Sequence, residues 1–164
     1  MKPAYRAIKA ANPNVFVISG APAPTGFFGG VCTPQGCDDA PYVREMIANG
    51  AADFMDCLGI HYNEGIIPPS QTSGDPRGNS GHYTRYFWGM TDTYWDAIGG
   101  RKPLCYTELG YLSGDDYGGV PPGFSWARDT SIAEHAQWLG EAVSLSKASP
   151  KICLLYTSPS PRDS

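Results

Sequence analysis

The sequence predicts an α/β fold with a parallel sheet, and more specifically part of a (β/α)₈ barrel. Apolar runs typical of strands begin near residues 15, 57, 104 and 151, and helical patterns lie between them. Segments from helix to strand are short, whereas those from strand to helix are long and rich in Gly, Pro and aromatic residues. No glycine-rich phosphate-binding motif follows a strand, which disfavours the alternative, a doubly wound dinucleotide-binding sheet.

The first half of the chain predicts two helices and two strands. The first helix ends before Asn12-Pro13, because proline disfavours a helical conformation in the preceding residue. The second has Pro41 in its first turn and ends at Asn49-Gly50. In order, we expect a helix over 3–11, a strand over 15–19, a helix capped by Asp38 or Asp39 with Tyr42, Val43, Met46 and Ile47 on its apolar face, and a strand over 57–62.

The second half repeats this alternation. Ser131 and Glu134 have the spacing of a capping box, so a helix begins there. In order, we expect a helix with Phe87, Met90, Tyr94 and Ile98 on its buried face, a strand over 104–109, a helix that buries Ile132, Ala136, Leu139 and Val143, and a strand over 151–156.

The 164 residues are too few for a complete barrel, which takes roughly 250. We therefore interpret residues 1–152 as a fragment of a barrel domain; the first helix follows Met1 at once, without a signal peptide. The end of the chain, CLLYTSPSPRDS (153–164), turns abruptly polar. Its residues 153–163 match the translation of a transposase sequencing adapter without a mismatch, so we expect 153–164 to be a non-native tail; the alternative is a genuine flexible terminus.

Composition excludes some classes of function. The net charge of −4 and the lack of a basic stretch argue against nucleic acid as a partner, and no apolar run is long enough to span a membrane. Cys32 and Cys37 either form a disulfide or are free thiols, whereas Cys57 and Cys105 are expected to be small buried hydrophobic residues. The cysteine spacing matches no zinc pattern. We expect an extracellular or cell-surface protein.

Glu108 is the strongest candidate for chemistry. It ends the strand in PLCYTELGY, where a lone carboxylate acts as a nucleophile, a general base or a metal ligand, or pairs with an arginine at the rim. His61 and Tyr62 end the preceding strand, and alternation sends one of them to the mouth and the other to the helix layer. Glu64, after Asn63, is a weaker acid/base candidate than a solvated loop residue.

The long loops supply binding surface for a sugar, because aromatic rings stack on its apolar faces and polar groups bind its hydroxyls. The aromatic residues expected around the mouth are Tyr83, Tyr86, Phe87, Trp88, Trp95, Tyr111, Tyr117, Phe124 and Trp126, although those on helices, such as Phe87, are better explained as core. The polar candidates are Asp75, Arg77, Asn79 and Arg85. No metal-binding motif and no G-x-S-x-G elbow is present, so we expect neither metal nor cofactor.

The segments GIHYN and PLCYTELGY resemble strands six and seven of clan A glycoside hydrolases, a (β/α)₈ superfamily, and most closely its family 5 and family 39 members. AIKAANPNVFVISG resembles the helix before strand five and strand five itself, so the chain would span strands five to seven and the start of strand eight. The resemblance implies that Glu108 is the nucleophile and His61 lines the substrate site. It implies that the acid/base glutamate lies on strand four, before Met1.

From these residues and this resemblance we expect a retaining glycoside hydrolase with a carbohydrate substrate, inactive as this fragment alone. The expected substrate-binding residues are His61, Tyr62, Asn63, Tyr111 and Trp126. Two alternatives stay open: a non-catalytic carbohydrate-binding or surface-associated barrel, and another α/β hydrolase or lyase in which Glu108 is a base.

Overall fold

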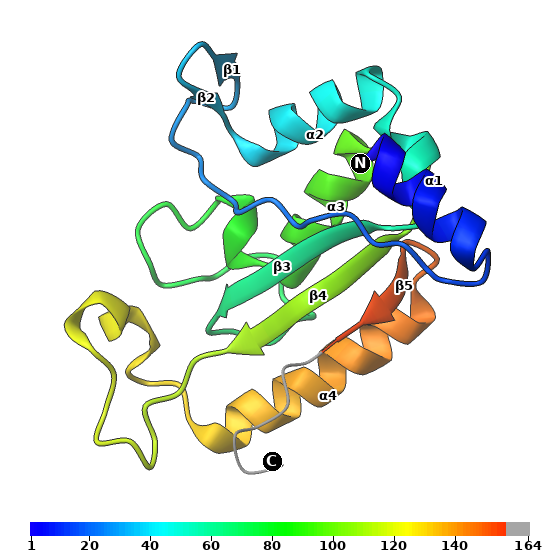
Figure 1. Cartoon of the computed structure of the whole chain (residues 1–164). Helices are drawn as coiled ribbons and strands as arrows, with labels where there is room; N and C mark the ends of the chain where they lie inside the picture. The colour runs from blue at the N-terminus through cyan, green and yellow to red at the C-terminus, as the bar shows by residue number, and fades with distance from the viewer. Residues whose placement is uncertain (157–164) are drawn as a thin grey trace.

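The computed structural model describes residues 1–156 as a mixed α/β structure with a parallel sheet of three strands (Figure 1). The strands are β1 (Cys32–Thr33), β2 (Gly36–Cys37), β3 (Leu58–Gly65), β4 (Leu104–Tyr111) and β5 (Ile152–Leu155). The helices are α1 (Lys2–Ala11), α2 (Asp39–Ala48), α3 (Phe87–Ala97) and α4 (Ile132–Ala148), with 3₁₀ helices at Ala51–Phe54, Tyr83–Arg85 and Pro122–Ala127. Residues 157–164 of the expected tail lie outside the described part.

The central sheet has the order β3-β4-β5, and all of its pairings are parallel. The expected strand over 15–19 is reduced to a single parallel bridge between Ile18 and Cys57. Its backbone is held beside β3 by only a few bonds, and Val15 and Phe16 remain exposed, so this segment is not a full strand. Over the described residues the sheet does not close into a barrel.

The hydrophobic core lies between the sheet and the helices. Leu58, Ile60 and Tyr62 of β3 face the same core as Leu104, Tyr106, Leu109 and Tyr111 of β4. The prediction for α3 is confirmed, because Phe87, Met90, Tyr94 and Ile98 are all fully buried. Phe87 stacks on Tyr106 of β4 with ring centroids 5.2 Å apart. Each such side chain contributes about 1.5–3 kcal/mol through burial.

The capping box at the start of α4 is confirmed, but of the four residues predicted for its buried face only Leu139 packs against the core. Ile132 and Val143 are 42% and 47% exposed, and Ala136 is exposed as well. Trp138 is buried instead, with Ala142 and Ser146 on the same side. The large Trp138 ring packs 5.2 Å from the Tyr111 ring of β4 and fixes this rotation of the helix.

The long loops follow the carboxyl ends of β3 and β4, as predicted, and both leave the same edge of the sheet (Figure 1). A disulfide joins Cys32 to Cys37 across the β1–β2 hairpin. A second disulfide joins Cys57 to Cys105 and ties β3 to β4, which corrects the expectation that these two cysteines are simple hydrophobic residues. Within the described residues, none of the helices has the length and apolar character needed to cross a membrane.

Candidate functional site

A β-bulge in β4 decides where Glu108 lies. Tyr106 pairs with Ile60, but the next pair in register is Glu108 with His61, so Thr107 is an extra residue. Regular alternation would place Glu108 on the same face as the fully buried Tyr106. The extra residue instead puts the Glu108 side chain, 55% exposed, on the opposite face. Bulges are enriched beside active sites, where they re-aim a side chain.

Two polar side chains of β3 contact Glu108 on this face. The Asn63 side-chain amide donates a hydrogen bond of 2.9 Å to Glu108 Oε2. His61 Nδ1 lies 3.5 Å from the same oxygen, within ion-pair distance when the imidazole is protonated. The sequence predicts His61 and Glu108 on neighbouring strands, and it predicts Asn63 as a substrate contact but not as a partner of Glu108. The structure therefore brings three of the expected site residues together.

Tyr62 and Tyr111 lie on the core side of the sheet, not beside Glu108. Their rings meet edge to face, with centroids 5.8 Å apart, and both are almost fully buried. The Tyr62 hydroxyl donates to the Arg85 carbonyl at 3.2 Å, and burial raises the pKa of Tyr62 above its ordinary value. Alternation thus sends His61 to the Glu108 face and Tyr62 to the helix layer. Both tyrosines are placed as core residues, which corrects their expected role as substrate contacts.

Trp126 is held by an arginine from the other long loop. The Arg77 guanidinium lies over the Trp126 ring, 4.8 Å from its centroid. Arg77 also donates to both carboxylate oxygens of Asp75, at 2.6–3.2 Å, and to the Glu64 carbonyl at 2.8 Å. The Asp75 side chain is completely buried. Asp75 and Arg77 therefore join the loops at the ends of β3 and β4, and are not free to bind sugar hydroxyls as the sequence suggested.

Glu64 is paired, which corrects its expected state as a solvated loop residue. Its Oε2 lies 2.6 Å from Arg85 Nη1 and 3.9 Å from Arg77 Nη1. Glu64 and Arg85 also line a polar pocket of about 230 Å³ that includes Asn79 and His82. Because its carboxylate is committed to two arginines, Glu64 is a poor candidate for the acid/base of this site.

Two carboxylates are adjacent at the start of α2, and the first of them, Asp38, anchors the loop that precedes the helix. Asp38 accepts hydrogen bonds from the Phe28 and Gly30 backbone amides, at 3.0 and 2.6 Å, and from the Thr25 hydroxyl at 2.6 Å. These bonds, led by that of Phe28, lower the pKa of Asp38 to about 2. Asp38 is the N-cap residue by position, but its side chain binds this loop and not the helix amides.

The next residue, Asp39, serves the helix layer. It accepts from the hydroxyls of Tyr83 and Tyr94, at 2.6 and 2.7 Å. Tyr83 therefore has a structural role, because its hydroxyl bonds to Asp39, and it is not one of the aromatic side chains around the barrel mouth. Of the other aromatic residues expected around the mouth, Tyr86 and Phe87 are buried, Trp88 and Trp95 pack against the core, and Tyr117 and Phe124 are exposed.

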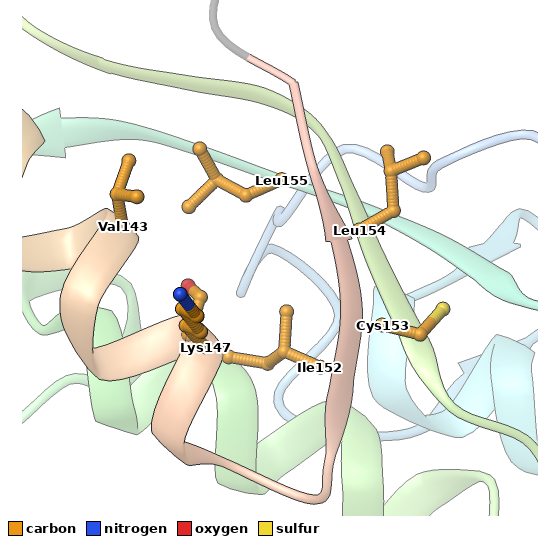
Figure 2. Close-up of a pocket in the computed structure, with 7 residues that line it drawn as sticks. Val143, Lys147, Ile152, Cys153, Leu154 and Leu155 are labelled. Atoms are coloured by element: carbon orange, nitrogen blue, oxygen red, sulfur yellow. The ribbon is translucent and has the colours of Figure 1, made fainter.

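A second hollow, of about 270 Å³, lies between α4 and β5 and is formed by Val143, Lys147 and apolar residues of β5 (Figure 2). It lies on the helix side of the sheet and is lined by no carboxylate, so it is separate from the Glu108 site. Among the described residues, one group could offer three ligand atoms to a metal ion: Cys57, Cys105 and Cys153. Two of these sulfurs are consumed in a disulfide, so the oxidised chain does not present a three-thiolate site.

Comparison with models of protein families, with curated proteins and with solved structures found no match for this chain.

Proposed function

We propose that this chain carries the nucleophile of a retaining glycoside hydrolase and that Glu108 is that nucleophile. The observation that supports this most is the bulge at Thr107, which places the Glu108 carboxylate on the face opposite the helix layer. In parallel α/β folds, active sites are built at the carboxyl ends of the strands, where Glu108 lies.

The contacts of Glu108 suit a nucleophile. Asn63 donates to Oε2, which fixes the plane of the carboxylate and leaves Oε1 to attack. In the proposed reaction, Oε1 bonds to the anomeric carbon while the glycosidic C–O bond breaks. The leaving oxygen takes a proton from a second carboxylic acid. That group then removes a proton from water, and the water oxygen displaces Glu108 from the sugar.

A second carboxylate about 5–5.5 Å from the nucleophile is needed for retention. Glu64 is already paired with Arg85 and Arg77. We therefore propose that the acid/base residue belongs to another part of the parent protein, as the resemblance implies. We therefore expect that this chain alone does not hydrolyse aryl glycosides.

The test uses the parent protein and a 2-deoxy-2-fluoro glycoside, which forms a glycosyl ester that hydrolyses slowly. We expect mass spectrometry of a peptic digest to find the label on Glu108, and Glu108→Gln to lower kcat roughly 10⁴-fold or more. Glu45→Gln, on the exposed side of α2, is the matched control. A label on another carboxylate, or unchanged turnover by Glu108→Gln, would contradict the proposal; sugar binding without any label would favour the non-catalytic alternative.

A further inference from the structure

Three cysteine sulfurs from consecutive positions across the sheet meet at one point. Cys57 directly precedes β3, Cys105 lies in β4 and Cys153 lies in β5. Cys57 and Cys105 form a disulfide. The Cys153 sulfur lies 3.3 Å from that of Cys105 and 3.6 Å from that of Cys57, which is van der Waals contact with both ends of the bond.

The backbone of β5 accounts for this contact. Leu104 pairs with Ile152 and Cys105 pairs with Leu154, so Cys153 is the extra residue of a second bulge. Figure 2 shows the Cys153 side chain pointing away from the groove beside α4, on the side of β5 opposite to Leu155. The bulge therefore directs the Cys153 thiol toward the disulfide and away from the helix layer.

We propose that Cys153 exchanges with the Cys57–Cys105 disulfide, so that the chain exists as two disulfide isomers. The Cys153 thiolate attacks the Cys105 sulfur, a Cys105–Cys153 bond forms, and the Cys57–Cys105 bond breaks. Cys57 leaves as a thiolate and takes up the proton that Cys153 lost, so no oxidant or reductant is consumed. One isomer ties β3 to β4, and the other ties β4 to β5.

The topology selects Cys105 as the sulfur that is attacked. Cys105 is on the middle strand, so either neighbour can pair with it. Cys57 and Cys153 belong to the two outer strands, which do not pair with each other, and the Cys153 sulfur lies nearer to that of Cys105, at 3.3 Å, than to that of Cys57, at 3.6 Å. Because Cys153 lies beside the disulfide and not along its axis, its side chain rotates before the sulfurs come into line.

The surroundings of the three sulfurs set how the exchange responds to pH. Cys57 and Cys105 are completely buried, whereas Cys153 is exposed. Burial of part of the Cys153 side chain raises the pKa of its thiol. Exchange should therefore accelerate as the pH rises toward that pKa, because the thiolate is the attacking species.

The inference does not rest on the proposed function. Cys153 is the first residue of the segment 153–164, which we expect to be a non-native tail, so the exchange is a property of this chain and not of the parent protein. It bears on the candidate site, because the Cys57–Cys105 bond joins the two strands whose ends carry His61 and Glu108. In the isomer with a Cys105–Cys153 disulfide, no covalent bond joins these two strands.

The test is disulfide mapping of the folded chain. Samples are held at pH 6 and pH 8.5, quenched with acid and N-ethylmaleimide, and digested without reduction for mass spectrometry. We expect Cys57–Cys105 with alkylated Cys153, and also Cys105–Cys153 with alkylated Cys57, the second isomer forming faster at pH 8.5. Cys153→Ser should give only Cys57–Cys105, and the double variant Cys32→Ser/Cys37→Ser should behave as the unaltered chain.

A chain unfolded in guanidinium chloride serves as the reference, since it forms every pairing, including Cys57–Cys153. The proposal is overturned if the folded chain holds only Cys57–Cys105 at both pH values. It is equally overturned if the folded chain gives the same mixture as the unfolded reference, because the selection of Cys105 would then be absent.

Discussion

Replacing Asp75 with alanine should destabilise this chain more than the loss of any other single ion pair described here. The Asp75 side chain is completely buried, and that of Arg77 is only 10% exposed. Alanine at position 75 leaves the buried Arg77 guanidinium with only one carboxylate near it, that of Glu64, which lies 3.9 Å away and is shared with Arg85. Breaking one side of a buried pair costs about 3–5 kcal/mol, against about 5–15 kcal/mol for the whole stability of a domain.

The pair Lys151–Asp92 provides the matched control. Its atoms are as close, at 2.7 Å, but its side chains are 33% and 54% exposed. Solvent screens such a pair, so Asp92→Ala should change the free energy of unfolding by less than about 1 kcal/mol. From the interatomic distances alone, the two substitutions would be expected to lower the free energy of unfolding equally. Because the two pairs differ in burial, we expect the loss for Asp75→Ala to be several-fold larger.

Urea unfolding followed by tryptophan fluorescence measures both variants, and a thermal scan should show Asp75→Ala melting about 6–20 °C lower. A double variant, Asp75→Leu with Arg77→Met, tests the reasoning further. Removing both charges should cost less than removing Asp75 alone, because no unpaired charge remains buried. A double variant less stable than Asp75→Ala, or an Asp75→Ala loss no larger than that of Asp92→Ala, would refute the argument.

Three further predictions concern other parts of the chain. The pKa of Asp38, lowered to about 2 by the bonds from Phe28 and the rest of its loop, lies below the ordinary value of about 3.9. Its contribution to stability is therefore complete above pH 4 and lost as the pH falls toward 2, and Asp38→Asn should flatten this part of a plot of unfolding free energy against pH. Phe87→Ala should cost about 3–5 kcal/mol in urea unfolding because the ring is fully buried, while the exposed Phe124→Ala should stay within about 0.5 kcal/mol. Ser131→Ala removes the side-chain cap of α4 and should cost about 0.5–2 kcal/mol in the same assay, whereas Ser131→Asn should retain most of the stability.

Local signals in the sequence predicted most of the fold. The spacing of Phe87, Met90, Tyr94 and Ile98 located α3 and its buried face, and the Ser131–Glu134 pair located the start of α4. These predictions held because each depends on residues within one or two helical turns. The sheet order was also accessible, since consecutive strands joined by helices pair in parallel.

Contacts between distant segments could not be predicted in this way. The Arg77–Trp126 stack and the hydrogen bond from Asn63 to Glu108 join residues of different loops and strands. The buried face of α4 was missed because apolar residues lie on more than one side of that helix, and only the position of the Tyr111 ring selects Trp138. The periodicity of apolar residues shows which faces of a helix could be buried, but the surface that the helix packs against determines which face is buried.

The apolar pattern of β4 does contain the signal for the position of Glu108. Leu104 and Tyr106 face the core, and so do Leu109 and Tyr111, yet no two-residue alternation joins the first pair to the second. One unpaired residue, Thr107, reconciles them. Without it, alternation from Leu104 and Tyr106 would bury the Glu108 carboxylate beside Tyr106, at a cost of several kcal/mol, and would also turn Leu109 and Tyr111 out of the core. The same extra residue therefore shifts the apolar pattern by one position and exposes the Glu108 carboxylate. This explains how a carboxylate is accommodated at residue 108 of an otherwise apolar strand.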